Sequence, residues 1–383
     1  MHDFLVKKLS NNDIQQELKV IGFDQSYIHK GWEKFEYLNF KIFNVSSAQA
    51  NILKQTALSV GADCATHRDV ITGKAETSDC ILGGSISQLT KISQKLEFQP
   101  FNLKKLAQEI KTNLNITYPD KTKLVGILNL TQNSFSDGGF YYEKDDAIKH
   151  LNELIEDGAD IIDIGAESTK PYSNSVSPAD QLGKILPILD YINKNNIEIP
   201  VSIDTRSSEV AQECINNGAS IINDVSGLEY DKNMLHVLSN NTNIKIIIQH
   251  SNGTPENMQN NPIYNNLMDD IYKNLNQKVN TAISYGILKN NIIIDPGIGF
   301  GKTRENNFEI IQRWREFKSI NCPIMLGISR KSLLCMEESP NVEKDIYTLA
   351  LNSILINEKI DYIRIHNVKM HKKLLEILQN TTK

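Results

Sequence analysis

The chain has 383 residues, which is enough for two domains or for one large barrel with a smaller module. Its composition is that of an ordinary globular protein, and its formal net charge of -5 gives no indication of a nucleic-acid partner. No apolar run approaches the roughly 18 residues that cross a bilayer, and the N-terminal segment lacks the apolar core of a signal peptide. We therefore expect a cytoplasmic protein with no membrane partner.

The five cysteines are odd in number and never stand at the spacing of a CxxC motif. This pattern favours reduced thiols packed as small apolar groups over a metal site or a disulfide framework.

Residues 1–115 are expected to form a small first domain. Its predicted elements are, in order, a strand at 35–43, a helix at 46–61, short strands around Cys64 and Ile81, a helix at 85–96 and an extended segment at 97–101. This order is typical of a small α/β sandwich of ferredoxin-like type. The adjacent His67, Arg68 and Asp69 are interpreted as a solvated loop rather than a polar site, and the polar segment 111–123 as a linker.

Residues 116–383 show a repeating pattern of short apolar strands, each followed by a helical segment. The predicted strands are 124–130, 160–165, 199–204, 220–225, 244–249, 291–296, 323–329 and 361–366. Eight such units over roughly 250 residues are typical of a (β/α)8 TIM barrel. The alternative is an open doubly wound sheet, which would normally use fewer units and a glycine-rich first turn.

The segment 291–303, NIIIDPGIGFGKT, ends one of these strands with a carboxylate. Its three isoleucines are typical of a strand buried on both faces, and the glycines beyond Asp295 let the backbone bend or approach a ligand closely. Only three residues separate Gly297 from Gly301, so the segment is not a nucleotide-binding P-loop, which needs four. Asp295 is therefore expected at the C-terminal end of a buried strand, where parallel α/β proteins place their active sites.

Polar residues follow the predicted strands. In chain order they include Asn129, Glu167, Asp204, Asn223, His250, Asp295, Lys331, Arg364 and His366. Any one alone could be a helix cap, as a lone Asp before a helix usually is. Because the C-terminal ends of barrel strands meet at one mouth, we expect the set to surround a single site.

One group of these residues suits a flat ligand. Asp204, Asn223 and Asp295 offer carboxylate and amide groups, which match an edge of N–H donors beside a carbonyl. Lys331 would add a donor for the ring carbonyl or a ring nitrogen.

The other group suits an anion. Asn129, Arg364 and His366, with the serine-rich loops, match a diphosphate accompanied by a hard cation. A diphosphate beside a heterocycle is a leaving group, so the predicted reaction is a substitution at carbon.

At these residues the sequence closely resembles the dihydropteroate synthase family. The matching segments are GILNLTQNSFSDGG (126–139), DIGAESTKP (163–171), IDTRSSEVA (203–211), IINDVSG (221–227), DPGIGFGKT (295–303), GISRKS (327–332) and RIHNV (364–368). They occur in the family's order across residues 123–380. The first domain also resembles the extra N-terminal domain of a longer bacterial subset of the family.

The resemblance implies a transferase that condenses (7,8-dihydropterin-6-yl)methyl diphosphate with 4-aminobenzoate. The products would be 7,8-dihydropteroate and diphosphate, in folate biosynthesis. A pterin-methyl cation is stabilised by electron donation from the ring, so ionisation ahead of amine attack is expected, with the protein stabilising the departing diphosphate. The resemblance also implies Mg2+ as cofactor, a homodimer and an enzyme class targeted by sulfonamides.

By the same resemblance, each matching residue has an expected role. The pterin would be held by Asp204, Asn223, Asp295 and Lys331, of which Lys331, Asp204 and Asp295 would be catalytic residues. The 4-aminobenzoate pocket would consist of Ser168, Thr169, Lys170, Pro171 and Ser332, and the diphosphate would be bound by Thr169, Arg364 and His366. Asn129 would coordinate Mg2+, and a mobile loop would contain Ser136 and Asp137.

Four positions depart from the family's pattern. They are Lys170 in place of Arg, Gln132-Asn133 in place of Pro-Asp, Asn252 in place of Arg and Asn367 in place of Asp. Lys170 keeps its charge but loses the planar fork of Arg. None belongs to the pterin set, so the departures bear on loop geometry, on 4-aminobenzoate affinity and on sulfonamide sensitivity.

Two other functions could use the same barrel. A methyltetrahydrofolate-type methyltransferase has no leaving diphosphate, so Arg364 and His366 would lack a purpose. A non-catalytic pterin-binding or scaffold protein is favoured only by the Lys170 change, because Asn129 and Lys331 are retained. Residues 1–115 have no predicted role; they lack the paired acidic metal motif of a fused pyrophosphokinase.

Overall fold

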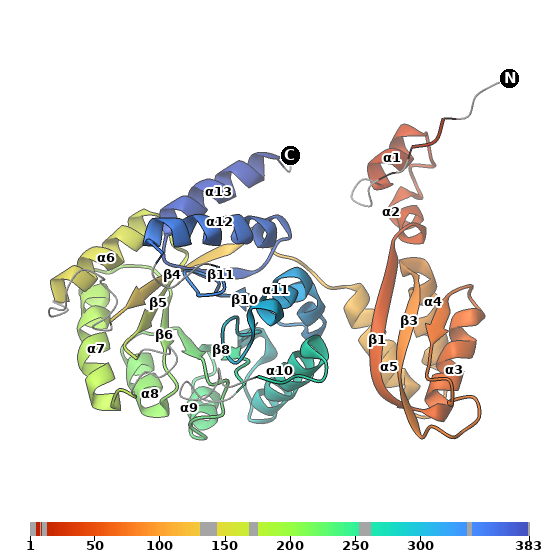
Figure 1. The fold of residues 1–383 in the computed structure, drawn as a ribbon, viewed down its shortest axis with the longest axis horizontal. Helices are drawn as coiled ribbons and strands as arrows, with labels where there is room; N and C mark the ends of the chain where they lie inside the picture. The colour runs from red at the N-terminus through yellow and green to blue at the C-terminus, as the bar shows by residue number, and fades with distance from the viewer. Residues whose placement is uncertain are drawn as a thin grey trace. The chain divides into compact units, whose positions relative to one another are not determined.

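The computed structural model describes residues 5–7, 9, 14–130, 144–167, 175–252, 262–334 and 339–381. They form two compact units, Met1–Ile116 and Thr117–Lys383, coloured from red to orange and from yellow to blue in Figure 1. Each unit has its own buried apolar core. In the described part of the chain, no helix is long and apolar enough to cross a membrane.

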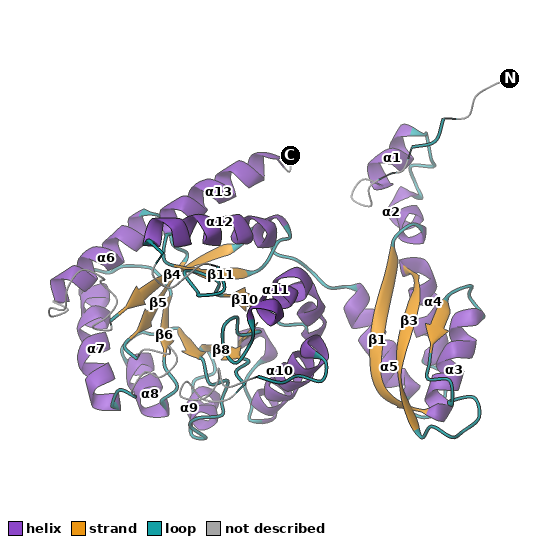
Figure 2. Ribbon diagram, viewed as in Figure 1, coloured by secondary structure: helices purple, strands orange, loops and turns teal. Residues whose placement is uncertain are grey.

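The first unit is a three-stranded antiparallel sheet packed against helices, as Figure 2 shows. Its elements are α1 (Ile14–Val20), α2 (Ile28–Gly31), η2 (Trp32–Lys34), β1 (Tyr37–Ser46), α3 (Ser47–Leu58), β2 (Asp63–Ala65), β3 (Thr77–Ser85), α4 (Ile86–Leu96) and α5 (Leu103–Leu114). The strand order is β1-β3-β2. Ser46 and Ser85 begin α3 and α4 with capping boxes, which fixes where each strand passes into a helix.

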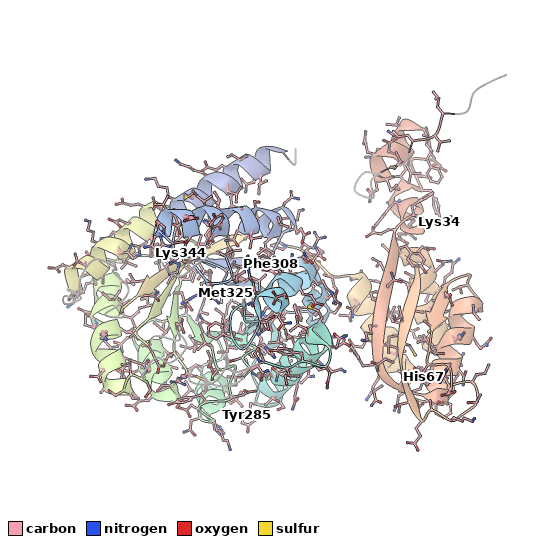
Figure 3. All side chains as sticks on the ribbon, viewed as in Figure 1. Lys34, His67, Tyr285, Phe308, Met325 and Lys344 are labelled. Carbon is pink, nitrogen blue, oxygen red and sulfur yellow. The ribbon has the colours of Figure 1, made fainter. Side chains whose placement is uncertain are left out.

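This unit contains three of the four strands of a ferredoxin-like sandwich. The extended segment predicted at 97–101 is wrong: the chain turns there and enters α5, because Phe101 and Asn102 both have φ of 60°. The predicted linker also begins later than expected, since α5 continues to Leu114. His67, Arg68 and Asp69 lie in an exposed turn between β2 and β3, as expected for a solvated loop (Figure 3).

The second unit is a parallel (β/α)8 barrel, and the predicted fold class is confirmed. Its strands are β4 (Lys123–Asn129), β5 (Ile161–Gly165), β6 (Val201–Asp204), β7 (Ile221–Asp224), β8 (Lys245–Gln249), β9 (Ile292–Asp295), β10 (Met325–Leu326) and β11 (Tyr362–Ile365). They pair in the order β10-β11-β4-β5-β6-β7-β8-β9. A parallel bridge between Ile294 and Ile324 joins the two ends of this sheet, so the ring closes.

Helices surround the barrel in Figures 1 and 2. They are α6 (Lys144–Glu156), α7 (Pro178–Lys194), α8 (Ser208–Asn216), α9 (Met234–Asn240), α10 (Leu267–Ser284), η3 (Lys289–Asn291), α11 (Arg304–Arg313), η4 (Trp314–Ile320), α12 (Asn341–Asn357) and α13 (Val368–Thr381). Outward-facing strand residues such as Ile162, Ile203 and Ile294 pack against them in the main core.

The inside of the barrel is divided into an apolar layer and a polar layer. The apolar layer consists of Val125, Ile161, Ile221, Ile247, Ile293, Met325 and Tyr362, and Figure 3 labels Met325 within the barrel. Side chains two residues apart on a strand face the same way. Two residues beyond the apolar layer, five of these seven strands carry a polar residue, namely Asp163, Asn223, Gln249, Asp295 and Arg364, whereas Ile127 and Gly327 stand at the corresponding positions after Val125 and Met325. The strand geometry therefore places a polar layer directly above an apolar floor.

The cysteines agree with the prediction as far as they are described. Cys64, Cys80, Cys214 and Cys322 are buried free thiols, whereas Cys335 lies outside the described residues.

Candidate active site

Arg364 of β11 joins two carboxylates across the barrel mouth. Its Nε donates to Oδ2 of Asp163 at 2.5 Å, and its Nη2 donates to Oδ2 of Asp204 at 2.7 Å. Asp163 is fully buried and Asp204 is 7% exposed. Because β5, β6 and β11 each contribute one member, this triad ties distant segments of the sequence into one site.

Asn223 of β7 lies beside this triad. Its Nδ2 donates to Oδ2 of Asp163 at 3.2 Å, while its own Oδ1 is buried without a hydrogen-bond partner in the described structure. Oδ1 of Asp163 is likewise unpartnered. Buried polar atoms are normally paired, so these two oxygens are acceptors available to a ligand that donates hydrogen bonds.

Asp295 and Lys331 form the opposite wall of the site. Oδ1 of Asp295 accepts from the backbone nitrogen of Gly297 at 2.7 Å, which folds the loop after β9 back over the strand end. The Lys331 ammonium donates to the carbonyl oxygen of Ile298 and lies 4.6 Å from the centre of the Phe300 ring. Lys331 is close enough to Asp295, Asp204 and Arg364 for their charges to shift its pKa.

Burial shifts the ionisation of these groups toward neutrality. It raises the pKa of Asp204 to about 7, against the opposing effect of the Arg364 guanidinium. It raises the pKa of Asp295 as well, although the Lys331 ammonium opposes this. Burial also lowers the pKa of Lys331 to about 8. Near neutral pH the site therefore contains groups that can change charge when a ligand binds.

His366 and Ser329 pair on the Arg364 side of the mouth. The Ser329 hydroxyl lies 2.9 Å from Nδ1 of His366, and it also accepts from the His366 backbone nitrogen at 3.2 Å. Burial lowers the pKa of His366 to about 3, helped by the Arg330 and Arg364 cations. His366 is therefore a neutral imidazole at physiological pH, and Arg364 and Lys331 supply the positive charge.

The loop after β9 is packed tightly against the end of β8. A Cβ atom at Gly297 would lie 1.9 Å from the carbonyl oxygen of His250, and φ at Gly297 is +74°. Nζ of the buried Lys302 lies 3.0 Å from Nδ1 of His250 and 2.9 Å from the carbonyl oxygen of Phe300. This packing holds Asp295 in place at the strand end.

A second buried ion pair lies at the edge of the mouth. Arg206 donates through Nε and Nη2 to both carboxylate oxygens of Glu167, at 3.2 and 2.9 Å, and both side chains are less than one-tenth exposed. The Tyr230 ring covers the guanidinium at 4.1 Å. Glu167 also raises the pKa of Asp204, so the pair is part of the electrostatic surroundings of the site.

The structure describes eight of the predicted site residues and brings them to one end of the barrel. They are Asn129, Asp204, Asn223, Asp295, Lys331, Ser332, Arg364 and His366. The predicted Ser136, Asp137, Ser168, Thr169, Lys170 and Pro171 lie outside the described residues. Among the four departures, Asn252 and Asn367 are described, and Nδ2 of Asn367 donates to Asp345 at 3.1 Å.

Sequence reasoning missed Asp163 and the Arg206–Glu167 pair. Asp163 stands inside a strand, and side chains within the strands of such a barrel usually fill its core. A charged residue between Ile162 and Ile164 was the available signal, since a buried carboxylate needs a partner. The pairing of Arg206 with Glu167 joins two loops and left no pattern along the sequence.

Asn129 fits a magnesium ion that arrives with a phosphate ligand. Among the described residues no group of three or more His, Cys, Asp or Glu could hold a metal. Mg2+ usually keeps several waters and takes one or two protein ligands together with substrate phosphates, so one amide oxygen is an adequate contribution. Gly165 leaves space there: a Cβ at that position would meet Cβ of Asp204 at 3.3 Å and Oδ1 of Asn129 at 3.7 Å.

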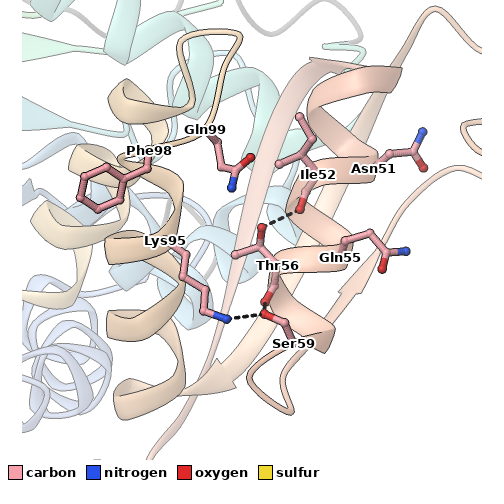
Figure 4. Close-up of a pocket in the computed structure, with 8 residues that line it drawn as sticks. All are labelled: Asn51, Ile52, Gln55, Thr56, Ser59, Lys95, Phe98 and Gln99. Carbon is pink, nitrogen blue, oxygen red and sulfur yellow. Dashed lines mark hydrogen bonds between the residues drawn. The ribbon is translucent and has the colours of Figure 1, made fainter.

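The first unit has a separate open groove of about 550 Å³ between α3 and α4. Its lining is Asn51, Ile52, Gln55, Thr56, Ser59, Lys95, Phe98 and Gln99 (Figure 4). Lys95 donates to the Ser59 hydroxyl at 2.8 Å, and Thr56 donates to the Ile52 carbonyl at 2.7 Å. The Thr56, Ser59 and Lys95 side chains thus bond within the first unit, so the barrel mouth is the better candidate for chemistry.

Comparison with known proteins identifies the barrel. A family model described as a pterin binding enzyme matches residues 125–366. Fold and site therefore define a pterin-binding barrel enzyme. The dihydropteroate synthase of Clostridium beijerinckii is 39% identical over 251 residues, which are 65% of this chain and 90% of that protein. The chain belongs to the dihydropteroate synthase family, as its sequence motifs predicted, and dihydropteroate synthesis for folate is the function of that family.

Other relatives differ in how much of the chain they match. The bifunctional dihydropteroate synthase/dihydropteroate reductase of Helicobacter pylori is 31% identical over 379 residues, 98% of either chain. The probable bifunctional folylpolyglutamate synthase/dihydropteroate synthase of Haloferax volcanii is 33% identical over 348 residues, and the chain spans 41% of its length.

Solved dihydropteroate synthase structures match about two thirds of the chain. The dihydropteroate synthase of Yersinia pestis has a TM-score of 0.64 at 31% identity, with 68% of this chain and 94% of that chain covered. The Anaplasma phagocytophilum enzyme, solved with bound 6-hydroxymethylpterin-monophosphate, has a TM-score of 0.61 at 33% identity and covers 68% of this chain and 99% of its own.

Proposed function

We propose that this chain condenses (7,8-dihydropterin-6-yl)methyl diphosphate with 4-aminobenzoate. The products are 7,8-dihydropteroate and diphosphate. The observation that carries the proposal is the Asp163–Arg364–Asp204 triad, which sets surplus acceptors beside a cation at one barrel mouth.

The acceptors suit a pterin ring. Asp204, Asn223 and Asp295 face the mouth, and Oδ1 of Asn223 has no partner in the described structure. The amidine-like edge of a pterin donates several N–H bonds, and bonds to a desolvated carboxylate are strong. Lys331, now bonded to the Ile298 carbonyl, can transfer its donor to a ring carbonyl or ring nitrogen. The Anaplasma phagocytophilum relative with its bound pterin monophosphate supports this assignment.

The diphosphate is assigned to Arg364, with His366 beside it. Arg364 keeps donors after its bonds to Asp163 and Asp204, because a guanidinium has five N–H groups. Neutral His366 contributes a hydrogen bond rather than a charge. Asn129 would hold Mg2+, which would add positive charge at the departing oxygens. Thr169 is assigned to this subsite by family resemblance alone.

The reaction is a substitution at the methylene carbon. The C–O bond to diphosphate breaks with its electron pair on oxygen, and the ring stabilises the resulting cation. The amine nitrogen then forms the C–N bond with its lone pair and releases one proton to solvent or to the diphosphate. The protein needs no nucleophile. Asp204 and Asp295 hold the pterin ring in place, and Lys331 donates a hydrogen bond that alters the charge of the ring. Arg364 stabilises the leaving diphosphate.

The 4-aminobenzoate site is assigned to the outer rim. Ser332 is exposed and adjoins Lys331 in the turn after β10. Ser168, Thr169, Lys170 and Pro171 are assigned to the same pocket by resemblance, with Ser136 and Asp137 in the first loop.

We assign the enzyme to the cytoplasm as a homodimer. Four buried free thiols support a reducing compartment. Val342, Ile346 and Ile354 of α12 are 72%, 52% and 51% exposed and recur every four or eight residues, so they share one helix face. A second copy would cover this apolar stripe. Residues 116–383 are the catalytic domain in this proposal.

A second candidate activity is reduction of the product. The Helicobacter pylori relative, named a synthase and a dihydropteroate reductase, matches 98% of the chain including the first unit. The test mixes the full chain with 7,8-dihydropteroate and a reduced nicotinamide cofactor and measures the rate at which the cofactor is oxidised. A higher rate than that of a chain lacking residues 1–115 would support this activity. Equal rates for the two chains would contradict it.

Release of diphosphate tests the main proposal. We expect release to require both substrates and Mg2+ and to yield dihydropteroate in equal amount. Pterin binding without turnover would instead support a scaffold protein. Methyl transfer from methyltetrahydrofolate without diphosphate release would support the methyltransferase.

A further inference from the structure

Asp163 is a buried carboxylate to which the proposed reaction assigns no step, although its unpartnered Oδ1 lies in the site. It lies within β5, is fully buried, and touches two groups of the proposed site, Arg364 and Asn223. Its position in the polar layer places it below the mouth, on the same face of its strand as Ile161 of the apolar floor. Burying an unpaired carboxylate is costly, so a role in holding its partners follows from its contacts.

The two carboxylates accept from Nε and Nη2 of Arg364, the two nitrogens that form the side edge of its guanidinium. Nε and one Nη2 hydrogen form the side edge of the planar group, which a single carboxylate commonly binds with both oxygens. Here Asp163 takes Nε and Asp204 takes Nη2. Nη1, which forms the end edge of the guanidinium together with Nη2, has no hydrogen bond to another described side chain. A phosphate oxygen pair fits that end edge.

The sharing also leaves Asp204 with a free oxygen. Only Oδ2 of Asp204 accepts from Arg364, and Oδ1 makes no hydrogen bond with the described residues. If Asp163 were absent, Asp204 could bind the whole side edge of Arg364 with both oxygens. The pterin ring would then have one hydrogen-bond acceptor fewer, because the Arg364 guanidinium would occupy both oxygens of Asp204.

We propose that Asp163 is a positioning residue that divides the donors of Arg364, so that Asp204 keeps one oxygen for the ring and Arg364 keeps its end edge for the diphosphate. This inference rests on the proposed function, because it assigns Asp204 to the ring. It adds that the two halves of the site are independent only while Asp163 occupies Nε of Arg364.

The test is a set of binding measurements on the full chain. The probes are 6-hydroxymethylpterin, which carries no phosphate, and inorganic diphosphate with Mg2+, each titrated by calorimetry. We expect Asp163→Ala to weaken ring binding about tenfold, one charge-assisted hydrogen bond, and diphosphate binding less than threefold. Asp163→Asn keeps the shape and an acceptor for Nε, so it should show a smaller loss of the same kind.

A double variant separates positioning from mere structural support. Adding Arg364→Gln to Asp163→Ala removes the guanidinium that would occupy Asp204, so ring affinity should recover toward that of Arg364→Gln alone. A purely structural role for Asp163 predicts no such recovery. Asp224→Asn is the matched control, because Asp224 is equally buried but bonds to Ser226 and Leu228 rather than to Arg364; it should show no loss that Arg364→Gln relieves.

Two outcomes would overturn the inference. One is a folded Asp163→Ala or Asp163→Asn protein whose ring affinity is unchanged. The other is a loss of ring affinity that Arg364→Gln does not relieve. Failure of the wild-type chain to bind either probe would instead count against the proposed function.

Discussion

The ammonium group of Lys331 donates a hydrogen bond to the carbonyl oxygen of Ile298, in the loop that begins at the buried carboxylate of Asp295. The cation is thereby held over the same loop that carries the acidic wall of the site. Its charge is partly matched by Asp295 and Asp204. The ionisation of Lys331 and that of the acidic groups are consequently linked, and this gives the site a defined dependence on pH.

We expect ring binding and catalysis to be best between pH values of about 7 and about 8. Burial raises the pKa of Asp204 to about 7, so its carboxylate forms only as the pH rises to that value. Burial lowers the pKa of Lys331 to about 8, so its ammonium is lost above that value. A bell-shaped profile of kcat/KM for the pterin substrate would show both limbs. Asp204→Asn should remove the acidic limb, and a flat profile from pH 5 to 10 would contradict the assignment.

The same raised pKa affects stability. The folded state keeps a proton on Asp204 up to a pH of about 7, whereas the unfolded chain releases it near the ordinary pKa of 3.8. The contribution of Asp204 to stability is therefore greatest below that value and is lost as the pH rises through about 7. Denaturant titrations of wild type and Asp204→Asn at pH 5 and pH 8 should show the variant gaining relative to wild type at the higher pH; the opposite trend would show that Asp204 is ionised throughout.

Gly297→Ala should destabilise the barrel far more than Gly286→Ala. Both glycines have positive φ, +74° and +96°, so both variants carry the strain of a left-handed residue, about 1–2 kcal/mol. Only at Gly297 would the new Cβ lie 1.9 Å from a carbonyl oxygen, whereas Gly286 has open space. We expect Gly297→Ala to lower the unfolding free energy by more than about 4 kcal/mol, which is exceptional for a single substitution. Equal unfolding midpoints for the two variants would show that the loop can move away from His250.

Arg206→Met should lower the unfolding free energy by about 3–5 kcal/mol, because it leaves Glu167 as an uncompensated buried charge. The double variant Arg206→Met with Glu167→Met should recover much of that loss, since the charge is removed with its partner. Arg313→Gln is the control: its ion pairs with Glu309 and Glu316 are exposed and should change stability by less than about 0.5 kcal/mol. A single-variant loss no larger than the control would mean that water reaches Glu167.

Asp295→Ala should weaken pterin binding by about 1–3 kcal/mol or more, because the N–H edge of the ring would lose a buried acceptor. Calorimetry with 6-hydroxymethylpterin measures the change. Asp190→Ala, which removes an exposed carboxylate paired with Lys194 on α7, should leave the affinity unchanged. Retained affinity in the Asp295 variant would mean that the ring binds elsewhere.

The fold of the barrel could be predicted because its strands are short, apolar and regularly spaced. All eight predicted strands are present, and Ile292, Ile293 and Ile294 are buried as a two-sided strand requires. The first domain was predicted less well. Glu97–Phe101 has aromatic residues that favour strands, but left-handed backbone at Phe101 and Asn102 turns the chain into α5 instead.

The position of the site could be predicted from the strand ends, but the hydrogen-bond partners within it could not. Asp204, Asn223 and Arg364 were expected at one mouth, and they meet there. The expectation of separate acidic and cationic halves was too simple, since Arg364 bonds directly to Asp204. Which donor meets which acceptor depends on side-chain reach across the barrel, and on Asp163, whose place inside a strand concealed it.

The apolar layer formed by Val125, Ile161, Ile221 and their neighbours makes the barrel a blind-ended well. Asn223 is 1% exposed and lies above this layer, whereas Ser332 is exposed in the turn after β10, so a molecule bound to Asn223 would lie deeper in the barrel than one bound to Ser332. With the pterin at Asn223 and 4-aminobenzoate at Ser332, as proposed, we expect the heterocycle to bind before the amine. We expect a compound that fills only the outer position to trap the heterocycle beneath it, so that its inhibition is uncompetitive with respect to the pterin substrate.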